Sequence, residues 1–232
     1  MSHVFGQPFA RRSFLKVGGA TAAGLVIAGC GGGSDTPTQE PAKPTNTRVA
    51  DVVLDFSQTT GVLNYTYALE QLAAAFYTAV NDLLYNGARP VERAALEEIG
   101  AHELAHREFF KAVLGSDAIG ALKPDFSEVD FSSRESVLQT AATFEKLGVG
   151  AYNGAAHYID IDGPLGTMPL MAAGDIVSVE ARHASTVLDL LADTQGGAFA
   201  PAAFDRALTP KAVLAAAQPF IRTSVVVQNV PG

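Results

Sequence analysis

Apolar residues recur every three or four positions along four stretches of the sequence, which is the spacing of one face of an α-helix. The pattern predicts four helices, at about residues 57–85, 90–115, 132–159 and 169–196. Helix-breaking residues separate the stretches: Asn-Gly at 86–87, Asp-Gly-Pro at 162–164 and Gly-Gly at 196–197. A capping box, Ser132-Ser133-Arg134-Glu135, is predicted to open the third helix.

The connections between the stretches predict how the helices are arranged. The short link at 86–89 makes the first two helices antiparallel neighbours. Residues 116–131 lack the apolar period, and extended chain of this length reaches on the order of 50 Å, enough to run along a bundle. The pattern therefore predicts an all-α four-helix bundle over residues 51–197, with a long crossover between helices 2 and 3. Residues 198–232 are predicted to be a short helical extension.

One short motif occurs twice on these predicted helices. Glu103 and His106 form a Glu-x-x-His motif, and Glu180 and His183 form another. Residues three apart lie on the same helix face, so each motif directs a carboxylate and an imidazole to one side. A glutamate in an apolar stretch of the preceding helix accompanies each copy, namely Glu70 and Glu145. Glu70 precedes Glu103 by 33 residues and Glu145 precedes Glu180 by 35, so the two separations nearly match.

These six residues predict a site for two divalent metal ions. Four carboxylates neutralise most of the charge of two such ions, and two imidazoles add neutral nitrogen ligands. Oxygen ligands with some nitrogen and no thiolate favour iron or manganese. The alternative is that the glutamates lie on solvated faces and the histidines are incidental. Tyr77 and Tyr152 each lie seven residues after a glutamate and share its face, as redox-active groups or as packed core residues.

A second interpretation of the same region is a zinc peptidase. His102-Glu103-Leu104-Ala105-His106 matches the His-Glu-x-x-His signature, in which both histidines bind zinc and the glutamate is the general base. This interpretation requires a third ligand downstream. It also leaves Glu70, Glu145 and the second Glu-x-x-His motif unexplained, so we expect His102 to support a ligand or to lie at the surface.

Composition narrows the class of protein. Of the 232 residues, 48% are hydrophobic and 17% are charged, which is typical of a chain that buries a core. The formal net charge of −8, with no basic run beyond the N-terminus, argues against nucleic acid as a partner. The sequence has one cysteine, so no internal disulfide can form.

The N-terminus resembles an export signal. Arg11 and Arg12 open a stretch similar to the twin-arginine export motif, and a short apolar run at 17–29 follows it. The run ends at Cys30 in a sequence similar to a bacterial lipobox, where the cysteine is lipidated. We therefore expect a signal peptide at 1–29, a lipid anchor in the membrane at Cys30 and a flexible Gly/Pro/Thr-rich tether at 30–50. The protein would then be an exported lipoprotein of the cell envelope, periplasmic or outer-surface.

The sequence resembles the ferritin-like domain family that includes bacterial exported proteins and plant desiccation-related proteins. The resemblance is carried by the following segments: 69–72, 76–77, 102–106, 148–152 and 179–183. It implies a ferritin-like four-helix bundle and assigns metal-ligand roles to Glu70, Glu103, His106, Glu145, Glu180 and His183.

The resemblance implies little about the reaction, and we consider two functions for such a protein. The first is a di-metal protein that acts on dioxygen, peroxide or ferrous iron. The second is a stress-associated structural or binding protein without turnover. A homo-oligomer is compatible with either function.

Overall fold

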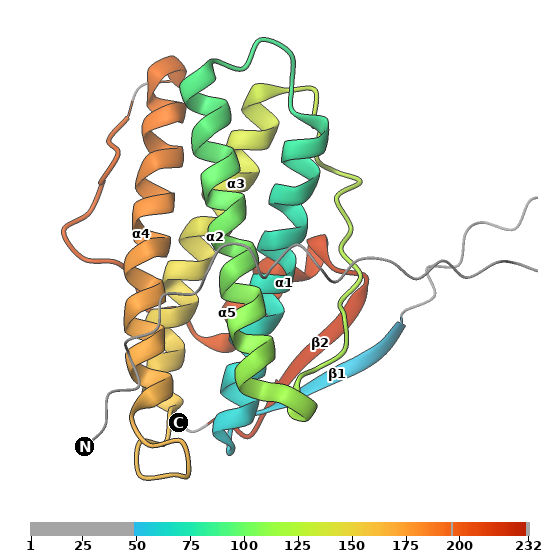
Figure 1. The fold of residues 1–232 in the computed structure, drawn as a ribbon, viewed down its shortest axis with the longest axis vertical. Helices are drawn as coiled ribbons and strands as arrows, with labels where there is room; N and C mark the ends of the chain where they lie inside the picture. The colour runs from blue at the N-terminus through green and yellow to red at the C-terminus, as the bar shows by residue number, and fades with distance from the viewer. Residues whose placement is uncertain (1–48, 196, 231–232) are drawn as a thin grey trace, which may run out of the picture. The chain divides into compact units, whose positions relative to one another are not determined.

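The computed structural model describes residues 49–195 and 197–230 of the chain (Figure 1). The predicted signal peptide, Cys30 and nearly all of the predicted tether lie outside these residues. No helix among the described residues has the length and apolar character needed to cross a membrane.

Four long helices lie side by side and form the bundle that the sequence predicts (Figure 1). They are α1 (Thr59–Leu83), α2 (Pro90–Leu114), α3 (Arg134–Ala155) and α4 (Met168–Gln195). Helix α1 packs mainly against α2, and α3 packs mainly against α4. The all-α bundle is therefore confirmed, and its two antiparallel pairs correspond to the two halves of the repeated motif.

The start of α3 differs by one residue from the prediction. Ser133 is the N-cap, and its hydroxyl accepts a hydrogen bond from the backbone N–H of Ser136 at 3.3 Å. Ser136 occupies the position where a capping box has glutamate, so the predicted box at 132–135 does not form. Glu135 instead accepts a hydrogen bond from Gln139, one turn further along the helix. Ser133 alone supplies the side-chain cap.

The crossover between α2 and α3 runs along the bundle, as predicted (Figure 1). It begins with a short 3-10 helix, η1 (Gly115–Asp117), and polar side chains of α1 hold the extended chain that follows. The Asn64 amide donates to the Asp117 carbonyl and accepts from the Ile119 N–H, both at 2.8 Å. Gln71 accepts a hydrogen bond from the Leu122 N–H at 2.8 Å. These bonds satisfy backbone groups that would otherwise lack partners against the helices.

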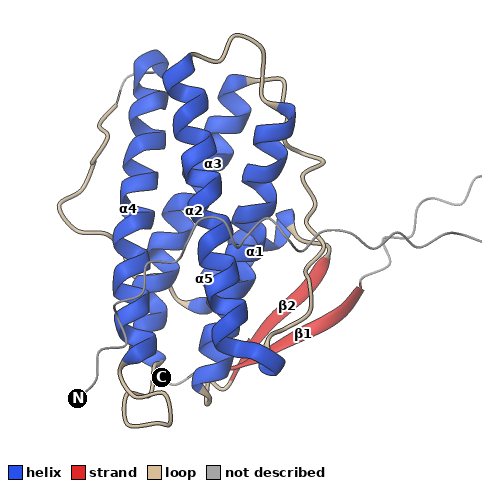
Figure 2. Ribbon diagram, viewed as in Figure 1, coloured by secondary structure: helices blue, strands red, loops and turns tan. Residues whose placement is uncertain are grey.

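A two-stranded parallel sheet was not predicted from the sequence (Figure 2). Strand β1 (Val49–Asp55) begins within the last two residues of the predicted tether, and β2 (Thr223–Gln228) lies in the C-terminal extension. Helix α5 (Pro210–Ala217) lies where the predicted helical extension has its helix, and β2 adds a strand that was not predicted. The two strands lie near opposite ends of the described sequence and pair with each other. Parallel pairing between segments so far apart in sequence has no short-range sequence pattern that would predict it.

An aromatic cluster joins the crossover and the C-terminal segment to the bundle. Phe76 of α1 contacts Phe126 of the crossover and Phe144 of α3, with ring centroids 5.8 Å and 5.0 Å apart. Phe144 in turn meets Phe220, which precedes β2, at 4.8 Å and nearly at right angles. These edge-to-face contacts are the preferred geometry of aromatic pairs. The cluster lies next to Glu145, which follows Phe144 on α3.

Candidate metal centre

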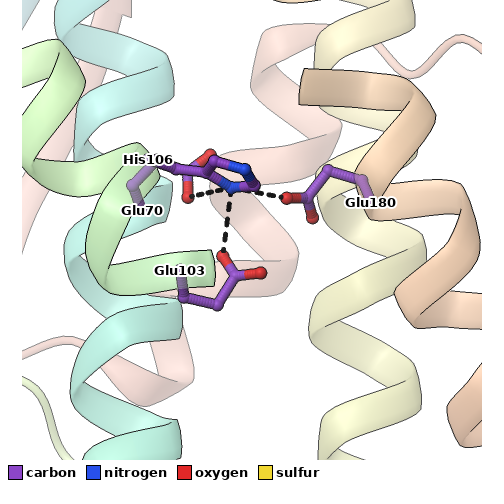
Figure 3. A group of neighbouring side chains, drawn as sticks. All are labelled: Glu70, Glu103, His106 and Glu180. Atoms are coloured by element: carbon purple, nitrogen blue, oxygen red, sulfur yellow. Dashed lines mark ion pairs between the residues drawn. The ribbon is translucent and has the colours of Figure 1, made fainter. Parts of the chain in front are cut away.

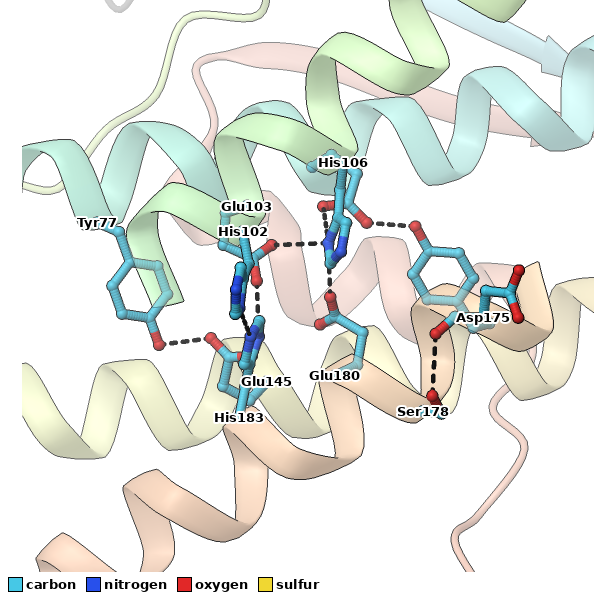
Figure 4. Close-up of polar contacts among 11 residues, drawn as sticks. Tyr77, His102, Glu103, His106, Glu145, Asp175, Ser178, Glu180 and His183 are labelled. Atoms are coloured by element: carbon cyan, nitrogen blue, oxygen red, sulfur yellow. Dashed lines mark hydrogen bonds and ion pairs between the residues drawn. The ribbon is translucent and has the colours of Figure 1, made fainter. Parts of the chain in front are cut away.

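All six predicted ligands converge in the middle of the bundle (Figures 3 and 4). Helix α1 contributes Glu70 and α3 contributes Glu145, while α2 and α4 each contribute one Glu-x-x-His pair. The four glutamates are at most 3% exposed, and the His106 side chain, at 12%, is the most accessible of the six. Such deep burial of four carboxylates excludes the interpretation that they lie on solvated helix faces.

The ligand atoms form two overlapping groups. One group contains Glu70, Glu103, His106 and Glu180, and its atoms all lie within 4.8 Å of one another. The other contains Glu103, Glu145, Glu180 and His183, within the same distance. Glu103 and Glu180 belong to both groups, so each of these carboxylates lies where it can bridge two metal ions. This is the ligand arrangement of di-metal carboxylate bundles.

The imidazoles face the carboxylates across a small space. His106 Nδ1 lies 3.1 Å from Glu180, 3.6 Å from Glu70 and 3.9 Å from Glu103 (Figure 3). His183 Nδ1 lies 2.9 Å from Glu103 and 3.3 Å from Glu145. Each of the six residues has one buried atom that forms no hydrogen bond. Orphaned buried polar atoms are rare in folded proteins, so six that converge on one space fit a bound cation.

The charges of the site require a cation or protons. Burial and the neighbouring carboxylates Glu180, Glu70 and Glu145 raise the pKa of Glu103 well above its usual value. Burial also raises the pKa of Glu180 to about 8, although His106 opposes that rise. Burial lowers the pKa of His106, but its contacts with Glu180 and Glu70 outweigh this and raise it to about 9. Divalent metal ions can take the place of these protons, because metal ligands bind in their deprotonated form.

Two tyrosines connect the halves of the site crosswise. The Tyr77 hydroxyl, on α1, donates to Glu145 Oε1 on α3 at 2.5 Å (Figure 4). The Tyr152 hydroxyl, on α3, donates to Glu70 Oε1 on α1. Burial, together with the adjacent carboxylates, raises the pKa of both phenols, so both remain hydrogen-bond donors. Glu70 and Glu145 thus each have one oxygen that accepts a hydrogen bond from a tyrosine and one oxygen that faces the centre of the site.

His102 contacts the predicted ligand His183 but belongs to neither group of converging atoms. Its Nδ1 lies 2.9 Å from Nε2 of His183, and the two rings are stacked within 11° of parallel (Figure 4). Among the described residues neither group of ligand atoms includes His102. The two histidines of the His-Glu-x-x-His signature therefore do not share a metal position, which argues against the zinc-peptidase interpretation.

A small cavity lies beside the four carboxylates. Its volume is about 20 Å³, and apolar side chains of α1 and α3, among them Leu72, Phe144 and Leu147, line the rest of its wall. Gly148 also faces it, and a Cβ atom there would lie 2.7 Å from Glu180 Oε2. A space of this size holds about one water-sized molecule. The glycine therefore lets the α3 backbone approach the shared carboxylate.

The comparison with protein families agrees with this geometry. The family model described as "Ferritin-like domain" matches residues 58–193. The chain belongs to the ferritin-like domain family. All six converging residues lie within the matched range, whereas β1, α5 and β2 lie outside it. No curated protein matches the chain in a sequence search.

Proposed function

We propose that this protein holds two iron or manganese ions in the bundle and acts on dioxygen, peroxide or ferrous iron. The observation that carries the proposal is the set of six unpartnered buried ligand atoms, arranged in two groups that share Glu103 and Glu180. Oxygen ligands with one imidazole per group suit iron and manganese better than thiolate-seeking metals. The family membership supports the same choice.

The residues have separate roles in this proposal. Glu70 with His106 would hold one ion and Glu145 with His183 the other, while Glu103 and Glu180 would contact both. The bound metals would supply one-electron redox chemistry. Tyr77 and Tyr152 keep the outer carboxylate oxygens fixed, so that the inner oxygens stay directed at the centre. The cavity of about 20 Å³ holds about one water-sized molecule, so it suits a small reactant better than an organic substrate.

We also propose that the protein is exported and anchored by lipid at Cys30. The support is in the sequence: Arg11-Arg12, the short apolar run at 17–29 and the small residues before Cys30. Residues 1–29 would be removed, and loss of Arg11, Arg12 and Lys16 would change the net charge from −8 to about −11.

Metal analysis of purified full-length protein tests the metal site. We expect close to two iron or manganese ions per chain in the wild type and little metal in a Glu70→Ala/Glu145→Ala double variant. The matched control is Glu97→Ala/Glu128→Ala, which removes two exposed glutamates and should leave the metal content unchanged. A folded wild-type protein that takes up neither metal would contradict the proposal.

Oxygen consumption separates turnover from structural metal binding. With ferrous iron or a reductant supplied, the loaded wild-type protein should consume dioxygen or peroxide faster than the double variant and as fast as the exposed-glutamate control. Stoichiometric metal without such consumption would favour the structural or stress-associated function instead.

A further inference from the structure

The two halves of the site have the same ligand types at matching positions, but they differ at the residue that precedes each shared glutamate. Glu103 and His106 correspond to Glu180 and His183, so His102 corresponds to Val179. A histidine can accept a hydrogen bond from a ligand imidazole, whereas a valine side chain has no acceptor. The residue before the shared glutamate is therefore a hydrogen-bond acceptor on α2 and an apolar residue on α4.

Because of this difference, the imidazoles of His183 and His106 have different surroundings. His183 has Nδ1 facing Glu103 and Glu145, and its Nε2 lies 2.9 Å from His102 Nδ1. In the tautomer that binds a metal through Nδ1, His183 carries its proton on Nε2, and His102 Nδ1 is placed to accept that proton in a hydrogen bond. His106 also faces the carboxylates with Nδ1, but no described residue forms a hydrogen bond with its Nε2.

The His183 side chain is also more buried than the His106 side chain. The His183 side chain is 5% exposed and is covered by the stacked ring of His102. The His106 side chain is 12% exposed. A ligand that is oriented and shielded from water has less freedom to lose when it binds a metal. The Glu145–His183 half is thus the more preorganised of the two.

We propose that His102 makes the two metal positions unequal, so that the Glu145–His183 half fills first and exchanges slowly, while the Glu70–His106 half fills second and exchanges readily. This inference rests on the proposed di-metal function. His102 is a positioning residue here, because it acts on the metal only through His183. The Glu70–His106 position is therefore the one at which a metal ion would enter or leave the loaded protein.

Titration of the metal-stripped full-length protein with Mn²⁺ tests the inference by calorimetry and electron paramagnetic resonance. The wild type should bind two ions in two steps, and the signal of an isolated ion should give way to that of a coupled pair in the second step. Glu145→Gln should remove the tighter step and Glu70→Gln the weaker one, which assigns each step to a half of the site.

Two variants at position 102 isolate the role of its acceptor. His102→Phe keeps a stacked ring but removes the acceptor, and should weaken the tighter step by about 10–100-fold while leaving the weaker step unchanged. His102→Gln retains an acceptor and should restore most of the affinity. Thermal unfolding of the metal-free variants controls for folding.

The possible results separate this inference from the proposed function. Two equal steps in the wild type, or equal weakening of both steps by His102→Phe, would overturn the inference and leave the di-metal function intact. Failure of the wild type to bind any Mn²⁺ or Fe²⁺ would overturn both.

Discussion

At the scale of single residues, the site combines groups that are unfavourable together without a metal. Four carboxylates are buried within a few ångströms of one another, and Glu103 is in contact range of both histidines. Buried carboxylates raise one another's pKa, and their mutual repulsion opposes folding of the deprotonated protein. The residues proposed to bind metal therefore reduce the stability of the bundle when no metal is bound.

Glu103→Gln should make the metal-free protein more stable. The pKa of Glu103 lies well above its ordinary value of 4.5 in the folded chain, so the folded state binds more protons than the unfolded state as the pH rises above 4.5. Stability then falls with rising pH, and glutamine, which does not ionise, removes this loss. We expect a higher Tm for the chelated variant at pH 8, by about 2–4 °C for each kcal/mol gained.

Scanning calorimetry at two pH values checks this prediction. At pH 5 the difference between the chelated proteins should shrink, because the wild-type glutamate is then protonated in the folded state. The same variant should bind less metal, since it lacks one shared carboxylate. A variant that is less stable than the wild type at pH 8 would show that Glu103 does not oppose folding of the empty site.

The sequence predicts these six residues because spacing along a helix decides which side chains share a face. The Glu-x-x-His motif places two side chains on one helix face, and this can be predicted from their spacing alone. The motif occurs twice at nearly equal separations from a preceding glutamate, which indicates both halves of the site. The hydrogen bonds from Tyr77 to Glu145 and from Tyr152 to Glu70 could not be predicted in the same way. They connect residues 68 and 82 positions apart, and depend on how α1 and α3 pack.

At the scale of elements, the C-terminal segment packs against α3 at glycines. The Leu208 N–H donates to the Gly150 carbonyl at 2.9 Å, so the segment runs directly on the helix. A Cβ atom at Gly154 would lie 1.9 Å from the Leu208 carbonyl oxygen. No side chain larger than hydrogen fits there unless the segment moves away.

Gly154→Ala should therefore destabilise the protein despite the higher helix propensity of alanine. Propensity favours alanine by about 1 kcal/mol, but the clash with backbone should cost more, with overpacking typically about 1–3 kcal/mol. The control is Gly174→Ala on α4, where a Cβ atom meets nothing within 4 Å and alanine should stabilise the chain. Urea unfolding measures both, and a stabilised Gly154→Ala variant would show that the segment is loosely held.

The elements differ in how well the sequence predicts them. The four helices are long and periodic, so their ends were predicted within a few residues. Strands β1 and β2 are short, and each is stabilised by a partner at the other end of the described chain. Their valine-rich character fits a strand only once that partner is known.

At the scale of the whole molecule, two helix pairs enclose the site, and the termini of the described chain are joined beside them. The parallel pairing of β1 and β2 connects the residues that precede α1 with the residues that follow α5. The described chain therefore begins in a strand held by hydrogen bonds, and a tether would attach at residue 48 to ordered structure rather than to a free helix end.

Replacement of Cys30 tests the proposed anchor in the intact protein. A thiol is required for lipidation, so Cys30→Ser should move the protein from the membrane fraction to the soluble exported fraction and abolish labelling by fatty acid. The acyl chains supply the membrane affinity, at about 0.8 kcal/mol per buried CH₂ group, and serine cannot carry them. Cell fractionation and mass spectrometry of the N-terminus measure both effects.

A second variant separates the anchor from export. Arg11→Lys/Arg12→Lys keeps the positive charge before the apolar run but removes the twin-arginine pair, so the chain should accumulate uncleaved and unlipidated inside the cell. Metal content of this retained form then shows where the site is loaded. Two ions per retained chain would mean that metal enters the folded bundle before export, and a wild-type protein that is soluble and unlabelled would refute the anchor.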